Sequence, residues 1–240
     1  MPLGSLIDKD VMAARTAVVL QPSYLPWLGY LAQVQRSDVF VIYDDVQFDK
    51  HGWRNRNRVK TAQGAQWLTV PVCTTGQNRP TNREIGIENK QPWRKKHLAT
   101  LKQSYAKAPY FTQIMPTFEA LLEQDWHHLI DLNVACFDAI NHLLGLKREI
   151  CFSSELGVEG QNVDRLIAIC RKLGADRFYV GAAGRDYIDD SQFTSAGIAI
   201  EYQDYRHPVY AQLHGEFIPF LSVVDLLFNC GPKSLEILTQ

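Results

Sequence analysis

The segment QPSYLPWLGY, residues 21–30, follows directly on the apolar run AVVL and carries residue types that suit ligand binding. Gln21 offers an amide that can read a polar group, while Tyr24 and Trp27 offer flat faces on which a sugar or a base can stack. The two prolines fix the shape of the loop, and Gly29 lets a phosphate approach the start of the following helix. Packing in the core is the alternative role for both aromatic residues.

A second polar segment, DDVQF (residues 44–48), follows the apolar run VFVIY. The carboxylates of Asp44 and Asp45 suit a general base, a hydrogen bond to ligand hydroxyls or a Mg²⁺ ion, and Gln47 joins them as a substrate-binding candidate. Because successive side chains of a strand point to opposite faces, both aspartates reach one pocket only if the chain bends there. A helix cap or a turn is the alternative role.

The segment WRNRNRVK, residues 53–60, alternates basic and amide side chains. On a strand this pattern predicts one cationic face and one amide face, made by Arg54, Arg56, Arg58 and Lys60 and by Asn55 and Asn57. A row of guanidinium groups fits a diphosphate, because each fork binds two oxygens, and Trp53 can stack on a base or a sugar. The alternatives are an RNA contact and a charged edge strand that resists aggregation.

Two further segments carry candidate site residues near the end of the chain. In GAAGRDY, residues 181–187, the small residues around Gly181 and Gly184 let backbone amides face an anion. Arg185 can hold a phosphate or a carboxylate, and Tyr187 can position a hydroxyl.

The segment YRHPVYAQLHGEF places His207 in a loop, and His207 is the candidate general base because imidazole titrates near neutral pH. A structural hydrogen bond is its alternative role. Tyr210 and Gln212 follow as substrate-binding candidates. Asp225 and Asn229 share one face of a predicted helix, where they either line a pocket or cap neighbouring loops.

Apolar runs and helical periodicity predict the elements that position these segments. Strands are expected at 17–20, 39–43, 150–152, 177–180 and 198–202, and helices at 28–36, 162–173 and 221–228, with a last short helix. Helical spacing over 93–144, interrupted at Pro109 and Pro116, predicts three helices. The run RVKTAQGAQWLTVPV predicts a hairpin that returns over 67–72.

The alternation of strands and helices predicts an α/β fold with a mainly parallel, Rossmann-like sheet and a helical insertion in the middle of the chain. The expected organisation is a flexible N-terminal tail at 1–15 and a single α/β domain at 16–240, with a helical subdomain at about 92–146. Ligands bind outside the carboxyl ends of parallel strands. The polar segments that follow strands are therefore expected to meet in one cleft.

Composition narrows the class of protein. Apolar residues make up 46% of the 240 residues, which is enough for a core, and the net charge of −1 provides no global basic field for nucleic acid. No apolar run reaches the roughly 18 residues that span a membrane. The five cysteines show no C-x-x-C pair, which favours a cytoplasmic location, and no metal ligands of the usual spacing are found.

Two resemblances follow from these motifs. The PWLGYL stretch resembles, in its position after the first strand, the H-x-G-H motif of nucleotidylyltransferases of the class-I-synthetase-like superfamily. Trp27 and Tyr30 occupy the positions of the two histidines of that motif. More extensively, QPSYLPWLGYLAQVQRSDVFVIYDDVQF and GADRFYVGAAGRDYID resemble the WbqC-like protein family. That resemblance implies a role in bacterial surface-polysaccharide (O-antigen, lipopolysaccharide) or related biosynthesis.

Together these features favour a transferase that attaches an acyl or aminoacyl group to a nucleotide-activated amino sugar or a similar small amine. A nucleotidylyltransferase-like enzyme with a degenerate H-x-G-H site is one alternative. A non-catalytic module that binds a sugar nucleotide or RNA is another. Mg²⁺ and a tRNA are possible partners, and the oligomeric state is not predicted.

Overall fold

The computed structural model describes residues 14–50, 52–74 and 78–240. Within them a central sheet contains five strands: β1 (Thr16–Leu20), β2 (Val39–Ile42), β7 (Glu149–Phe152), β8 (Arg177–Val180) and β9 (Ala199–Tyr202). The strands lie in the order β7-β2-β1-β8-β9, and every neighbouring pair is parallel. This arrangement confirms the predicted α/β class with a Rossmann-like sheet. The predicted tail at 1–15 falls mostly outside the described residues.

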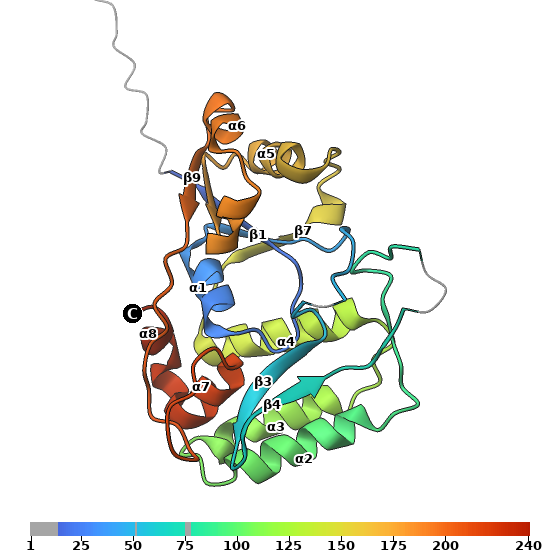
Figure 1. Cartoon of the computed structure of the whole chain (residues 1–240), viewed down its shortest axis with the longest axis vertical. Helices are drawn as coiled ribbons and strands as arrows, with labels where there is room; N and C mark the ends of the chain where they lie inside the picture. The colour runs from blue at the N-terminus through green and yellow to red at the C-terminus, as the bar shows by residue number, and fades with distance from the viewer. Residues whose placement is uncertain (1–13, 51, 75–77) are drawn as a thin grey trace, which may run out of the picture.

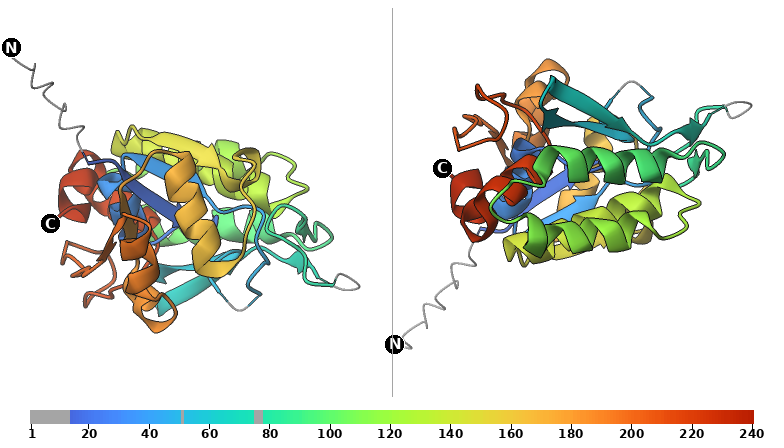
Figure 2. Two further views of the ribbon diagram at one scale, coloured as in Figure 1. Left: turned by 90° about the horizontal axis from the view of Figure 1, so that it is seen from above. Right: turned by 90° about the horizontal axis from the view of Figure 1, so that it is seen from below.

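Helices cover both faces of this sheet (Figures 1 and 2). On one face lie α1 (Leu28–Arg36) and α4 (Leu129–Leu144), and on the other lie α5 (Asn162–Lys172) and α6 (Asp190–Ser195). The cause is the alternation of side chains along buried strands. Val18 and Phe40, which are neighbours in register, pack with α1 and α4, whereas Ala17 and Val39 pack with α5.

A long insertion separates β2 from β7 (Figure 1). It contains the hairpin of β3 (Arg56–Thr61) and β4 (Gly64–Thr69), the short pair of β5 (Val72–Cys73) and β6 (Gly86–Ile87), and the helices α2 (Trp93–Tyr105), α3 (Phe111–Leu122) and α4. The hairpin closes with Thr61 paired to Gly64, so its return strand begins earlier than the predicted residue 67. Its return strand ends at Thr69 rather than at residue 72, because Pro71 has no N–H for the ladder and Val72 already pairs with Ile87.

The insertion contains the three expected helices, but Pro116 does not separate two of them. Pro116 lies inside α3, and the second break follows Leu122. A proline inside a helix removes one backbone hydrogen bond. The helix continues because its apolar face, which includes Met115 and Phe118, stays buried on both sides of the proline.

Residues 203–222 connect β9 to α7 (Val223–Cys230) without regular secondary structure, and α8 (Ser234–Leu238) follows. Polar contacts hold this long loop: Lys60 Nζ donates to the carbonyl of Gly215 at 3.2 Å and to that of Glu216, and Ser222 N donates to Arg58 O at 2.8 Å. None of the described helices has the length and apolar character needed to cross a bilayer.

Candidate functional site

A cleft of about 880 Å³ lies at the carboxyl ends of β1 and β8, where the strand order changes direction. In doubly wound sheets this switch point is where ligands bind. Strands β1 and β8, the loops after β1, β2 and β8, and the helices α1 and α5 supply its lining. The structure brings four of the predicted site residues together in this switch-point cleft: Gln21, Trp27, Arg54 and Tyr187.

Arg54 is a partly buried cation in this lining. Its Nη1 donates to the backbone carbonyl of Gln21 at 3.0 Å, and its Nε is buried without a hydrogen-bond partner among the described residues. Among those residues no carboxylate lies within 4.0 Å of it. Burial lowers the pKa of Arg54, and the charges of Tyr30 and Asp49 act in the opposite direction. An arginine stays protonated under such a shift, so the cleft holds a partly buried positive charge that has no carboxylate in direct contact among the described residues.

Gln33 lines the same cleft and was missed by the sequence reasoning. It lies on the buried face of α1, and its Oε1 is buried without a donor in the described part of the chain. A carbon added at Gly181 would lie 3.5 Å from Gln33 Nε2, so the loop after β8 passes close to this amide. A glutamine among Leu28, Leu31 and Val34 was the available signal, because buried amides usually have partners.

The indole of Trp27 packs against Gly29 at the start of α1, which accounts for both residues of the PWLGY segment. A Cβ on residue 29 would fall 2.0 to 2.5 Å from three ring atoms of Trp27, so the indole lies over the helix start that glycine leaves bare. Tyr30 follows, and its hydroxyl donates to Gln21 O at 3.2 Å. Burial raises the pKa of Tyr30 well above its usual value, which keeps the phenol neutral.

The two aspartates after β2 are used to hold neighbouring elements and do not line the cleft. Asp44 is 2% exposed and accepts hydrogen bonds from Ser154 N at 3.1 Å and Ser154 Oγ at 2.7 Å. Asp45 pairs with Arg165 of α5 at 2.5 Å. Partial burial raises the pKa of Asp45, but the hydrogen bonds from Arg165 and Ser153 outweigh it and hold that pKa below its usual range. The chain bends after β2, and one oxygen of each aspartate lies within hydrogen-bond distance of Ser153 Oγ, at 2.9 Å for Asp44 and 2.6 Å for Asp45.

Three predicted binding residues are buried in structural contacts outside the cleft. Tyr24 is fully buried and its hydroxyl lies 3.0 Å from His97 Nδ1. Asn55 Nδ2 donates to Val70 O at 2.8 Å, and Asn57 Nδ2 donates to Leu25 O at 2.7 Å. The two amides of the predicted amide face therefore donate to backbone carbonyls of the protein, one from just before β3 and one from within it.

Asp225 is the centre of a buried polar network between α7, α2 and the loop of residues 203–222. Tyr105 Oη donates to Asp225 Oδ1 at 2.7 Å, and Tyr210 Oη donates to Asp225 Oδ2 at 2.9 Å. Burial raises the pKa of Asp225, and the tyrosine hydroxyls oppose that shift. The other predicted residues of this region are also engaged: Lys60 with loop carbonyls, Gln212 with the backbone of Ile218, and Asn229 with Asp225 O.

The loop after β8 reaches the cleft through Ala183 and Tyr187, whereas Arg185 is exposed with its guanidinium 4.2 Å from the centre of the Tyr202 ring. Gly184 is buried against Val180. Gln47 is exposed and forms a bridge with Thr81. Ala183 and Tyr187 therefore line the cleft, whereas Gln47, Gly184 and Arg185 lie outside its lining.

His207 lies in an aromatic cluster of the loop of residues 203–222, outside the cleft lining. Its Nδ1 donates to Pro208 O at 2.9 Å, and its Nε2 is buried without a partner among the described residues. Phe217 and Phe220 lie edge-on to the imidazole at centroid distances of 5.7 and 5.3 Å. Burial lowers the pKa of His207, so the ring is neutral at pH 7.

The remaining members of the basic segment turn away from Arg54. The guanidinium of Arg56 lies 4.7 Å from the centre of the Trp67 ring, and the Trp53 ring packs at a tilt of 39° against Trp67, with 5.1 Å between the ring centroids. Trp53 and Arg58 line a smaller pocket that shares Trp27 with the cleft. The predicted row of guanidinium groups is therefore divided between two places.

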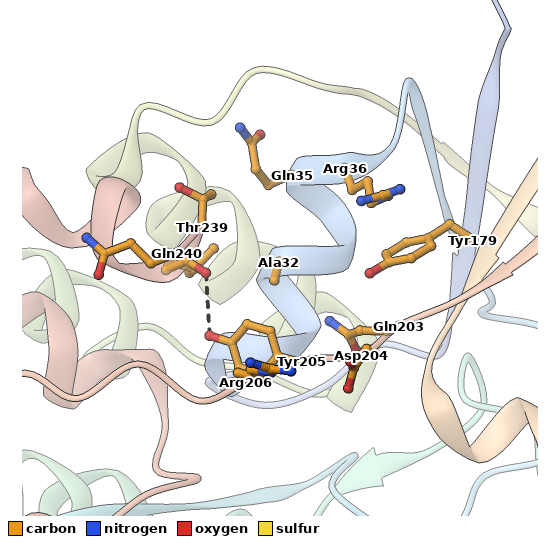
Figure 3. Close-up of a pocket in the computed structure, with 11 residues that line it drawn as sticks. Ala32, Gln35, Arg36, Tyr179, Gln203, Asp204, Tyr205, Arg206, Thr239 and Gln240 are labelled. Carbon is orange, nitrogen blue, oxygen red and sulfur yellow. Dashed lines mark hydrogen bonds between the residues drawn. The ribbon is translucent and has the colours of Figure 1, made fainter.

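A third hollow of about 400 Å³ lies between α1, the chain after β9 and residues 238–240 (Figure 3). Its lining includes Arg36, which pairs with Glu201 and lies 4.7 Å from the Tyr179 ring. The hydrogen bond drawn in Figure 3 joins Tyr205 Oη to Leu238 O at 3.4 Å. The hollow contains none of the predicted site residues.

Among the described residues, no group of three or more His, Cys, Asp and Glu side chains is arranged to hold a metal.

Comparison with known proteins defines the class. Residues 21–237 match the WbqC-like protein family, and the chain therefore belongs to that family. It is 34% identical over 226 residues to the uncharacterized protein Rv1507c of Mycobacterium tuberculosis, a match that covers 93% of this chain and 97% of the relative. No solved structure matches the chain.

Proposed function

We propose that this protein is a group-transfer enzyme that binds a nucleotide-activated small molecule, such as an amino sugar, in the switch-point cleft. The observation that carries the proposal is Arg54, a partly buried cation that faces the cleft without a carboxylate partner among the described residues. Partial burial of a charge is costly unless the charge is directly paired, and a phosphate group would pair with this guanidinium. WbqC-like family membership supports a place in surface-polysaccharide or related biosynthesis.

The other lining residues fit the rest of such a ligand. Gln33 Oε1 lacks a donor in the described structure and can accept a hydrogen bond from a hydroxyl or an amine. Trp27 and Tyr187 offer ring faces. Arg54 thus binds the anion, Gln33 orients the ligand, and the rings exclude water.

A non-catalytic binding module is the second candidate function. One observation favours it: the lining described here contains no carboxylate and no imidazole. His207 and Asp45 stay predictions for the general base, as do Mg²⁺ and a tRNA for partners. The nucleotidyl-transfer alternative has less support, because Trp27 and Tyr30 do line the cleft but carry no positive charge.

Isothermal titration with inorganic pyrophosphate and with UDP-linked amino sugars tests the binding step. We expect Arg54→Gln to weaken binding of both probes by roughly 10- to 100-fold, since a charge-assisted bond contributes about 1.5–3 kcal/mol and 1.4 kcal/mol is tenfold. Arg54→Lys keeps the charge without the fork and should recover part of the affinity.

Arg94→Gln is the matched control. Arg94 Nη1 also donates to a backbone carbonyl, that of Gln124 at 2.9 Å, but it lies on α2 outside the cleft lining. Equal affinities of wild type, Arg54→Gln and Arg94→Gln would refute the proposal. Incubating the protein with the UDP-linked amino sugar, with acyl-coenzyme A or charged tRNA and with Mg²⁺, and assaying for acylated product, separates the two functions. Binding without product would favour the binding module.

A further inference from the structure

A smaller pocket with aromatic walls shares Trp27 with the switch-point cleft. It has a volume of about 340 Å³ and is lined by Trp27, Trp53, Arg58 and Phe220. Trp53 and Phe220 are 38% and 48% exposed and line the same pocket, so they form an exposed apolar patch instead of isolated surface residues. We propose that this aromatic pocket binds the nucleobase of the ligand whose phosphates meet Arg54. The inference rests on the proposed function and specifies the substrate class further.

Arg58 joins the two outer walls of the aromatic pocket. Its Nη2 donates to Phe220 O at 3.3 Å, and its guanidinium carbon lies 5.9 Å from the centre of the Trp53 ring. It is the polar side chain in a lining that is otherwise indole and phenyl among the described residues. The pocket therefore offers flat apolar faces with a positively charged donor at one side.

The wall formed by Phe220 is held in place from several directions. Its backbone has a φ of +58°, which residues other than glycine and asparagine rarely adopt. Its ring packs against Trp27 at 5.9 Å and against His207 at 5.3 Å between centroids. Ser222 N, two residues on, donates to Arg58 O at 2.8 Å. Strained backbone that surrounding contacts enforce clusters at ligand sites, and here it presents an exposed aromatic ring.

The hydrogen-bonding groups of this pocket favour a base over a sugar. A pyranose carries hydroxyls around its rim, and those that are turned into the pocket need acceptors for their hydrogens. The guanidinium of Arg58 only donates, and the phenyl ring of Phe220 offers no acceptor. A nucleobase instead presents two π-faces for stacking and carbonyl or ring-nitrogen acceptors at its edge. The donor of Arg58 and the aromatic faces match those features.

The positions of the two pockets fit a single ligand. Trp53 and Arg54 are consecutive residues, yet Trp53 lines the aromatic pocket and Arg54 lines the cleft. Trp27 borders both. A ligand that passes the edge of Trp27 can therefore place a ring on Trp53 and Phe220 and a diphosphate at Arg54.

Titration of UDP, ADP, GDP and CDP against inorganic pyrophosphate tests this assignment. We expect one or more of the nucleoside diphosphates to bind at least tenfold more tightly than pyrophosphate. Phe220→Leu, which keeps an apolar side chain without a π-face, should weaken that nucleotide by roughly tenfold and leave pyrophosphate unchanged. Phe220→Tyr should retain the affinity. Val209→Ala is the matched control, because Val209 is an exposed apolar residue of the same loop outside the pocket.

The outcomes separate this inference from the proposed function. If pyrophosphate binding depends on Arg54 but every nucleoside diphosphate binds like pyrophosphate, or Phe220→Leu changes nothing, the base subsite is overturned and the anion site stands. Methyl glycosides that bind to the wild type and not to Phe220→Leu would show a sugar in this pocket and also overturn it. If neither pyrophosphate nor any nucleotide binds in an Arg54-dependent manner, both proposals fail.

Discussion

The indole of Trp27 lies over Gly29, so closely that a Cβ on residue 29 would fall 2.0 Å from Cη2 of the ring. Trp27 borders both the switch-point cleft and the aromatic pocket. The shape of both pockets thus depends on one glycine in the first turn of α1.

Gly29→Ala tests this dependence. Helix propensity alone predicts a stabilised helix, by about 1 kcal/mol. We expect the opposite sign, a loss of about 1–3 kcal/mol in the free energy of unfolding, because the methyl group must displace the indole. Urea unfolding and tryptophan fluorescence measure the two effects. Gly86→Ala is the control, since its added carbon would lie 3.8 Å from His127 O, which is an ordinary contact, and it should leave the fluorescence unchanged.

The buried imidazole of His97 should make the folded protein less stable in mild acid. Its imidazole is 4% exposed, and burial lowers its pKa from 6.5 to about 4. Above pH 6.5 the ring is neutral in both states. Between pH 6.5 and 4 the unfolded chain takes up the proton and the folded protein does not, so stability falls with pH, by about 2 kcal/mol at pH 5. Urea unfolding at pH 7.5 and 5.0 measures this.

The His97→Gln variant supplies the comparison for that experiment. It should lose most of the difference in unfolding free energy between the two pH values, because glutamine does not titrate. An unchanged pH dependence in the variant would show that other groups cause the acid sensitivity of the wild type.

Tyr210→Phe distinguishes a structural role of the buried network from a role in the site. The tyrosine hydroxyl donates to the fully buried Asp225, so its removal should cost about 1.5–3 kcal/mol of unfolding free energy. Affinity for pyrophosphate should stay at the wild-type value, since Tyr210 lies outside the cleft lining. A variant with wild-type stability and weakened pyrophosphate binding would show that Tyr210 is part of the binding site. Tyr205→Phe is the matched control, because Tyr205 makes a long bond of 3.4 Å to Leu238 O.

Much of the fold follows from patterns that the sequence displays. The runs at 17–20, 39–42 and 178–180 are apolar on both faces, which is typical of parallel strands between helices, and the structure contains them. Pro116 does not end a helix, although a proline favours a break locally, because contacts with other elements keep the apolar face of α3 buried. The packing of that face is not visible in the local sequence.

The candidate site was predictable where position after a strand decides it. Gln21 directly follows β1, and the structure places it in the cleft with Arg54. Residue type alone could not separate Arg54 from Arg185, because the burial of one and the exposure of the other depend on tertiary packing. Lys60 and Asp225 have charges that suggested ligand binding, yet both are buried in contacts within the protein.

The central claim is that Arg54 is the anion site of this protein, and the position of a bound anion tests it most directly. A crystal structure with pyrophosphate should show phosphate oxygens about 2.7–2.9 Å from the guanidinium nitrogens of Arg54, at the carboxyl ends of β1 and β8. Anion density at Arg185 or in the hollow beside Arg36, with the space next to Arg54 filled by solvent, would contradict the account.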